Sequence, residues 1–269
     1  MSLIPLAGRR LYYDLVGPQN APVICMTHSL ASDGGMWAEQ LGPLLASGYR
    51  VLRLDMRGHG GSDPVTGPYT MSELAADVVA ALDHLAIERV HFVGLSIGGM
   101  IGQAFAIEHP RRGISAMWCD TMPVVPQGNQ QSWEDRKRPV IEANSVAPQA
   151  DASIDRWLTP AFKARDPKRY KQLRDTIAAT SPAGYLGCVD AISKLDFVAN
   201  LPKVKIPVLV VCGGDDAGTP PEANKRIASL VADGRYQEIA AARHFPNVEH
   251  PETFNRIMLD WFQAQRGLK

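Results

Sequence analysis

The sequence has little that would indicate a nucleic-acid-binding or membrane protein. Its 28 lysines and arginines balance 28 aspartates and glutamates, so the formal net charge is zero. This balance gives no reason to expect nucleic acid or an anionic membrane as a partner. No apolar run reaches the ~18 residues that cross a membrane, and residues 1–10 lack the apolar stretch and cleavage site of a signal peptide.

Cysteine is also scarce. Three of the four cysteines lie within apolar, strand-like runs, and all are far apart in the chain: Cys25, Cys119, Cys188 and Cys212. We expect buried, reduced thiols of a cytoplasmic protein rather than disulfides. The sequence has no closely spaced cysteine and histidine cluster of the kind that binds zinc, and no phosphate-loop or dinucleotide fingerprint. We therefore expect neither a metal nor a cofactor.

What the sequence does contain is a Gly-x-Ser-x-Gly motif formed by Gly94, Ser96 and Gly98. An apolar run at 90–95 predicts a short buried strand before it, and 100–108 predicts a helix after it. A strand that turns sharply into a helix crowds the positions two before and two after the serine, so glycine fits there. This arrangement is typical of a nucleophile elbow, which pushes a reactive serine into a cleft.

Strands and helices alternate around this motif. This pattern predicts an α/β fold with a mainly parallel sheet flanked by helices. The strands are expected at 9–16, 22–27, 49–54, 90–95, 114–119, 207–211 and 236–239. The helices are expected at 36–46, 71–85, 100–108, 221–232 and 252–263.

The pattern changes between residues 122 and 197, where only helical stretches are predicted, at 133–144, 154–158, 167–179 and 182–192. The buried-strand pattern resumes at 207–211. A segment inserted between two strands of one sheet is best explained as a helical cap over the sheet edge. We therefore predict a core of 1–121 and 198–269 and a cap of 122–197.

A serine hydroxyl needs a base within hydrogen-bonding reach, and the base needs an acid that orients it. On this scaffold the chain order is serine, acid, histidine. His244 follows the last predicted strand, whereas His250 begins the last helix and is expected to face solvent. Three aspartates follow strands and could orient the histidine: Asp120, Asp215 and Asp216. Spacing does not choose among them.

Acyl transfer also needs donors for the oxyanion that develops on the carbonyl. One is expected from the backbone N–H of Ile97, directly after the serine. The other should come from the loop after the strand at 22–27, where we assign the N–H of Leu30.

These pieces resemble the α/β-hydrolases over the whole chain and, within them, the 3-oxoadipate enol-lactonase group. The matching segments are His-Ser-Leu at 28–30, Met-Trp at 36–37, Arg-Gly-His-Gly-Gly-Ser at 57–62, Gly-Leu-Ser-Ile-Gly-Gly-Met at 94–100, Cys-Asp-Thr at 119–121, Ser-Pro-Ala-Gly-Tyr at 181–185 and Thr-Pro-Pro at 219–221. Members carry Gly-x-x-Asp before Thr-Pro, which implies Asp216 as the acid. Trp133 and Arg136 resemble the group's Trp-x-x-Arg, which implies a pocket wall and a carboxylate ligand. Ser29 is also expected to line the pocket.

We therefore expect a cofactor-free serine hydrolase of a small carboxylic ester or lactone, acting through Ser96, Asp216 and His244. Two alternatives remain open. A perhydrolase or haloperoxidase would use the same three residues with peroxide, and a ligand receptor could retain them without turnover.

Overall fold

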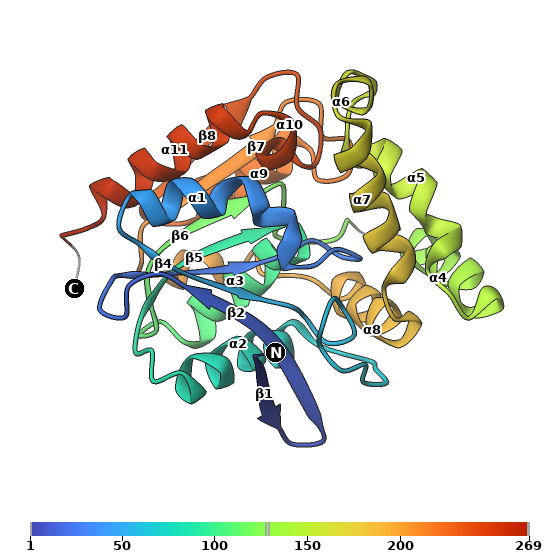
Figure 1. Ribbon diagram of the computed structural model, residues 1–269, viewed down its shortest axis with the longest axis horizontal. Helices are drawn as coiled ribbons and strands as arrows, with labels where there is room; N and C mark the ends of the chain where they lie inside the picture. Colours follow the sequence, from blue (N-terminus) through green and yellow to red (C-terminus); the bar gives the residue numbers. More distant parts are fainter. Residues whose placement is uncertain (1, 127, 129, 268–269) are drawn as a thin grey trace.

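A single sheet of eight strands runs through the part of the chain that the computed structural model describes, residues 2–126, 128 and 130–267 (Figure 1). Positions 127 and 129, inside the predicted cap, and 1 and 268–269 lie outside the described residues. The strands are β1 (Leu3–Leu6), β2 (Arg9–Val16), β3 (Val23–Thr27), β4 (Arg50–Leu54), β5 (Val90–Leu95), β6 (Gly113–Cys119), β7 (Val208–Gly213) and β8 (Gly234–Ile239).

The strand order is β1-β2-β4-β3-β5-β6-β7-β8. Strands β3 to β8 run parallel, and only β1 and β2 are antiparallel to their neighbours. The carboxyl ends of the parallel strands therefore meet at one edge, where active sites of such sheets form. The fold is thus the predicted α/β class with a mainly parallel sheet.

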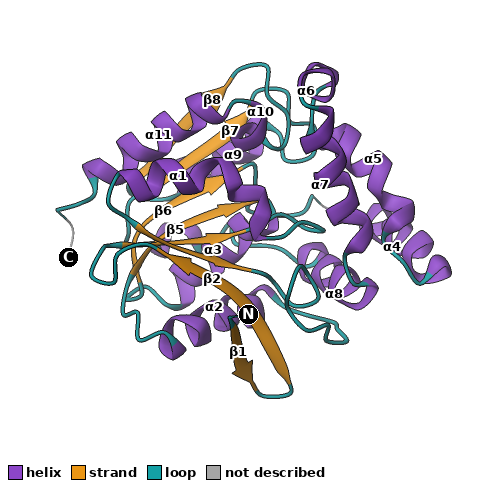
Figure 2. Ribbon diagram, viewed as in Figure 1, coloured by secondary structure: helices purple, strands orange, loops and turns teal. Residues whose placement is uncertain are grey.

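Helices cover both faces of this sheet (Figure 2). Helices α1 and α11 pack together on one face, whereas α2 and α3 pack together on the other, which α9 extends alongside β7 and β8. Their bounds are α1 (Ala38–Ala46), α2 (Met71–His84), α3 (Ile97–Glu108), α9 (Pro221–Leu230), α10 (Pro246–Glu249) and α11 (Pro251–Ala264). Short 3-10 helices precede α1 and β7, at Gly34–Trp37 and Leu201–Lys203.

Five more helices lie between β6 and β7 in the sequence and gather at one side of the sheet, shown at the right of Figure 1. They are α4 (Gln130–Ala143), α5 (Ala147–Trp157), α6 (Pro160–Arg165), α7 (Pro167–Ala179) and α8 (Pro182–Ser193). An isolated β-bridge between Val124 and Asp196 closes the base of this segment. Residues of α4, α5 and α8 line the same cavity as Ser96, which follows β5.

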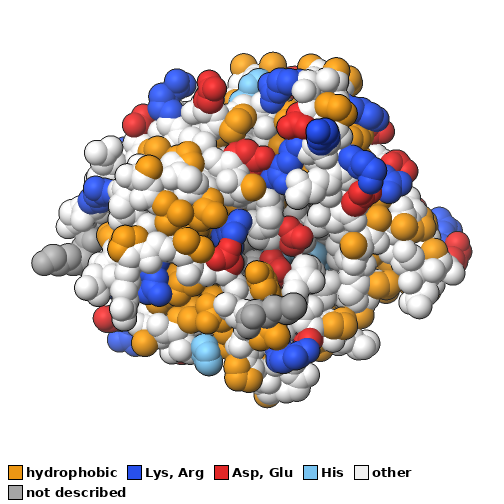
Figure 3. Space-filling view, viewed as in Figure 1, with side chains coloured by type: hydrophobic (Ala, Val, Ile, Leu, Met, Phe, Trp, Pro, Cys, Tyr) orange, Lys and Arg blue, Asp and Glu red, His pale blue; other side chains and the backbone are white. Residues whose placement is uncertain are grey.

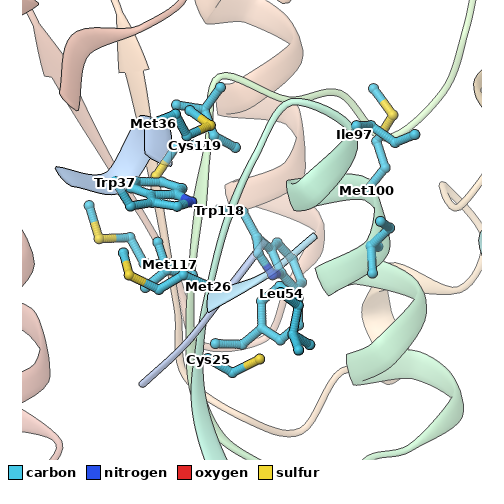
Figure 4. Packing of buried hydrophobic residues seen from close by; sticks show 14 of the residues in the cluster. Cys25, Met26, Met36, Trp37, Leu54, Ile97, Met100, Met117, Trp118 and Cys119 are labelled. Carbon is cyan, nitrogen blue, oxygen red and sulfur yellow. The ribbon is translucent and has the colours of Figure 1, made fainter. Parts of the chain in front are cut away.

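Both faces of the sheet are buried, and successive side chains along each strand point to opposite faces. Met117 and Trp118, neighbours on β6, point to opposite faces in Figure 4. The indole of Trp118 fills the space beside α3 so closely that a Cβ on Gly102 would lie 2.6 Å from its Nε1 atom. Glycine therefore lets α3 approach the sheet, which fixes the start of α3 next to the end of β5.

The surface agrees with the balanced composition. Lysine and arginine side chains alternate with aspartate and glutamate over the face seen in Figure 3. All four cysteines are buried and free of disulfides. Within the described residues, no helix combines the length and apolar character needed to cross a membrane.

Candidate active site

Ser96 occupies the sharp turn between β5 and α3. Its backbone has φ 59° and ψ −121°, a left-handed conformation that is rare for residues other than glycine. A Cβ on Gly94 would lie 2.2 Å from the carbonyl oxygen of Gly98, and one on Gly98 would lie 2.5 Å from that of Thr27. Both positions therefore require glycine, as the motif predicted. The helix begins at Ile97, directly after the serine and earlier than the predicted residue 100.

Hydrogen bonds to the neighbouring strand hold this turn. The Ser96 N–H donates to the carbonyl of Cys119 at 2.9 Å, and the Ser96 carbonyl accepts from the Thr121 hydroxyl at 2.8 Å. The main chain of Ser96 is thus fixed from both sides, which compensates for the cost of about 1–3 kcal/mol for a strained backbone.

His244 follows β8 and is paired with an aspartate. Its Nδ1 atom lies 2.8 Å from Oδ2 of Asp216, and both residues are buried. Asp216 also accepts hydrogen bonds from the Gly218 N–H at 2.8 Å, the Thr219 N–H at 3.2 Å and the Thr219 hydroxyl at 2.5 Å. A carboxylate can only accept, so the proton of the imidazole sits on Nδ1 and leaves Nε2 as a base.

Burial alone would raise the pKa of the Asp216 carboxyl. The charge and hydrogen bond of His244, together with the hydrogen bonds from Thr219, outweigh this effect and lower that pKa below its ordinary value. Asp216 is therefore an anion at neutral pH, as an orienting partner of an imidazole must be.

The structure separates the three aspartates among which spacing could not choose. Asp216 faces His244, whereas Asp215 is exposed. Asp120 is fully buried beside Asp216 and takes up a different set of hydrogen bonds. His250 is partly exposed and contacts the carbonyl of Ala241 through Nε2 at 3.1 Å, away from these acids.

Of the two expected oxyanion donors, Leu30 lines the same cavity as Ser96, and Ile97 directly follows the serine. Among the described residues, neither the Leu30 N–H nor the Ile97 N–H has a hydrogen-bond acceptor. The Leu30 loop is fixed by His28, whose Nε2 accepts from the Met56 N–H at 2.9 Å while Nδ1 lies 2.8 Å from the Ser29 carbonyl. Two free backbone donors beside a serine can together bind a developing oxyanion.

A cavity of about 280 Å³ connects these residues with helices α4, α5 and α8. Of the residues predicted from the sequence, it is lined by Ser29, Leu30, Ser96, Trp133, Arg136, Asp216 and His244. Ile97 is not among the lining residues. This agrees with its expected role, which needs only its backbone N–H. The Ser29 hydroxyl is buried and has no hydrogen-bond partner among the described residues, so it is available to a bound molecule.

The side of the cavity formed by α4 and α5 carries positive charge. The Arg136 guanidinium stacks over the Trp133 ring at 4.4 Å from its centroid. Burial and then the positive charge of Arg156 lower the pKa of Arg136. Among the described residues, neither arginine forms an ion pair with a carboxylate, and the buried Tyr185 also lines this side.

Sequence reasoning missed Arg156, Trp157 and Thr219. Trp157 lies over His244, with ring centroids 6.0 Å apart, and Thr219 holds Asp216. The only signal for the first two was an arginine and a tryptophan side by side in a cap helix, the same pair of residue types as Trp133 and Arg136. Their orientation depends on how α5 packs, which no local pattern encodes.

Asp120, Asp216 and His244 also form the one group of described residues whose ligand atoms, all within 4.8 Å of one another, could hold a metal ion. All of the groups except Oδ2 of Asp120 already have partners. The Gly213 N–H donates to Oδ1 of Asp120 at 2.8 Å, while Asp216 binds His244 and Thr219. A metal bound by all three residues would have to displace the hydrogen bonds of Asp216 and His244, so the donor set fits an acid–base pair better than a metal centre.

Comparisons with known proteins agree with this geometry. The family model described as "alpha/beta hydrolase fold" matches residues 22–251. A 3-oxoadipate enol-lactonase from Acinetobacter baylyi is 34% identical over 257 residues, which cover 92% of this chain and 91% of that protein. The enol-lactonase structure from Burkholderia xenovorans LB400 superimposes with a TM-score of 0.93 at 33% identity. The match covers 97% of this chain and 100% of that one.

A third relative is a thermophilic esterase from Thermogutta terrifontis, solved with malate bound, with a TM-score of 0.88 at 25% identity over 96% of this chain and 94% of that one. The chain belongs to the α/β-hydrolase fold family and is a hydrolytic enzyme. Within that family, the resemblance to the 3-oxoadipate enol-lactonases is confirmed.

Proposed function

We propose that the chain is a serine hydrolase that cleaves a small, carboxylate-bearing ester or lactone through an acyl-enzyme on Ser96, as an enol-lactonase would. The observation that carries this proposal is the pairing of His244 with Asp216 at 2.8 Å in the same cavity as the strained Ser96. The segment 122–197 acts in this proposal as the cap that selects the substrate.

In the first half-reaction, Nε2 of His244 takes the proton of the Ser96 hydroxyl as its oxygen attacks the carbonyl carbon. The backbone N–H groups of Leu30 and Ile97 stabilise the oxyanion. The tetrahedral intermediate then expels the leaving oxygen, which receives the proton from His244. In a lactone this oxygen stays tethered to the acyl group.

In the second half-reaction, His244 deprotonates a water molecule that attacks the acyl-enzyme. Collapse of this second intermediate breaks the bond to Ser96 and returns the proton to its oxygen. The product is a free carboxylic acid, and Asp216 stabilises the imidazolium in both halves.

The charge of the cavity supports a substrate that carries a carboxylate. Arg136 and Arg156 lie close enough for one to lower the pKa of the other, and neither has a carboxylate partner among the described residues. A carboxylate between them would relieve this repulsion and accept charge-assisted hydrogen bonds. The thermophilic esterase relative was solved with malate, itself a dicarboxylate, which agrees with such a site.

A fluorophosphonate probe tests the mechanism without knowledge of the natural substrate. We expect Ser96→Ala to abolish labelling and to lower the hydrolysis of nitrophenyl acetate by several powers of ten, as in other enzymes with this arrangement. Ser29→Ala removes another serine of the same cavity and should still be labelled. Labelling of the Ser96→Ala protein would refute the acyl-enzyme mechanism.

Matched esters test the substrate class. Arg136→Gln should lower kcat/KM for a mono-nitrophenyl glutarate by about 10- to 100-fold, since a hydrogen bond to a charged group contributes about 1.5–3 kcal/mol. The neutral nitrophenyl valerate should change by less than about threefold, because it lacks the charged group. The control is Arg138→Gln, an exposed arginine of the same helix whose partner is Asp135 at 3.1 Å. Equal losses on both esters would refute a carboxylate site at Arg136.

A further inference from the structure

One buried acid beside the site has no part in the mechanism described so far. Asp120 follows β6, is fully buried, and adopts a left-handed φ of 43°. Its Oδ1 atom accepts the Gly213 N–H at 2.8 Å, whereas its Oδ2 atom has no hydrogen-bond partner among the described residues. A buried, unpaired carboxyl oxygen costs stability, and strained backbone positions concentrate at functional sites.

The surroundings of Asp120 are acidic. Its carboxyl lies within 4.8 Å of the Asp216 carboxyl and of a ring nitrogen of His244. The other titratable groups around it are the thiols of Cys119 on β6 and Cys212 on β7 and the phenol of Tyr236 on β8. Burial and then the negative charge of Asp216 raise the pKa of Asp120 well above its ordinary value, and the Gly213 N–H opposes this only in part.

We propose that Asp120 is a positioning residue: a protonated carboxyl whose O–H donates to the Asp216 carboxylate and holds it against His244, and which ionises to orient His244 itself when Asp216 is lost. The first role gives the unpaired Oδ2 atom a function, since a carboxyl group can donate a hydrogen bond only when it is protonated. For the second, the carboxyl would have to move by at most about 2 Å to reach hydrogen-bonding distance from the imidazole.

This inference rests on the proposed serine mechanism. A purely structural role, in which Asp120 only accepts the Gly213 N–H and so ties β6 to β7, makes a different prediction. In that case asparagine, which keeps the accepting oxygen, would be an adequate replacement in every background. Under our proposal, asparagine suffices while Asp216 is present and fails once Asp216 is removed.

The test compares Asp120→Ala, Asp120→Asn, Asp216→Ala and the double variant Asp120→Asn with Asp216→Ala. The readouts are the rate of fluorophosphonate labelling and of nitrophenyl acetate hydrolysis from pH 5 to 9, with thermal unfolding to verify folding. We expect Asp120→Ala to lose about tenfold in rate, as for one hydrogen bond. Asp120→Asn should recover most of this loss, because its amide N–H can still donate to Asp216.

The decisive comparison is made without Asp216. Asp216→Ala empties space beside His244, and its rate should rise towards pH 9 as Asp120 loses its proton. The double variant should be at least tenfold slower at pH 9 and should show a much smaller rise. Asp215→Asn, a change in the exposed neighbouring aspartate, is the control and should stay within about twofold of the unmodified enzyme, as surface changes usually do.

Equal pH–rate profiles for Asp216→Ala and the double variant would overturn the role of Asp120. The role of Asp120 would also be refuted if the rate of the Asp216→Ala enzyme did not rise with pH. That result would count even if every Asp120 variant failed to fold. The serine mechanism itself is tested separately by Ser96→Ala. If that variant keeps its activity, the proposed function fails, whereas loss of activity there with identical Asp216 profiles refutes only the assignment to Asp120.

Discussion

Two buried histidines should make the enzyme unstable in mild acid. His59 is fully buried next to His28 in the loop that supports Leu30, and burial, followed by the charge of His28, lowers its pKa to about 3. His91 on β5 donates to or accepts from the Ser115 hydroxyl at 2.8 Å, and burial lowers its pKa to about 4. In the unfolded chain both should titrate near the ordinary value of 6.5.

The sign of the effect follows from these values. Between pH 6.5 and the folded values near 3 and 4, the unfolded chain binds protons that the folded protein does not. The contribution of the two neutral histidines to the free energy of unfolding is therefore fully present above pH 6.5. It falls as the pH decreases through this window. At pH 5, which is about 1.5 units below the unfolded pKa, each histidine lowers the free energy of unfolding by about 2 kcal/mol, at about 1.4 kcal/mol per unit. Together they lower the free energy of unfolding by about 4 kcal/mol relative to pH 7.5.

Urea unfolding at pH 7.5 and pH 5 measures this difference. His59→Asn and His91→Asn should each remove about half of the pH-dependent loss, whatever they do to stability at pH 7.5, because asparagine does not titrate. His84→Asn is the control, since His84 is exposed at the end of α2 and should leave the loss unchanged. If the double variant of His59 and His91 loses as much stability as the unmodified protein, the linkage to these two histidines is wrong.

Two further predictions concern the site. Gly94→Ala places a Cβ 2.2 Å from the carbonyl oxygen of Gly98 and should lower kcat by more than about 100-fold, the scale of losing an oxyanion donor. By contrast, Gly42→Ala in α1 meets nothing within 4 Å and should raise the free energy of unfolding by up to about 1 kcal/mol with kcat unchanged. Ser29→Ala should lower kcat/KM by about tenfold without lowering Tm, because its hydroxyl has no protein partner to lose. A lower Tm with kcat/KM unchanged would contradict a role for Ser29 in the pocket.

The sequence predicted the parts of the fold in which a buried apolar run is bounded by turn residues. The strand at 90–95 matches β5 (Val90–Leu95), and the helix at 167–179 matches α7 (Pro167–Ala179). It missed β1, which is four residues long, contains Pro5 and pairs only with β2. It also missed α6 and α10, which have six and four residues and are too short to display a helical period.

The candidate site shows the same limit. Local pattern placed Ser96 and His244 at strand ends, but three aspartates satisfied the same criterion. What separates Asp216 from Asp215 and Asp120 is the direction of each side chain, which is set by the turn after β7 and by the left-handed backbone at Asp120. Such directions depend on contacts between distant segments, so the resemblance to a family was needed to choose.

Helices α4–α8 leave the sheet after β6 and return to it at β7, and these two strands are hydrogen-bonded neighbours, with Cys119 opposite Val211. A single contiguous stretch of the gene therefore encodes about half of the residues that line the cavity, while Ser96, Asp216 and His244 are encoded on either side of it. Under the proposed mechanism, grafting a different helical segment between the same two strands should yield chimeras that keep the chemistry and acquire a new selectivity.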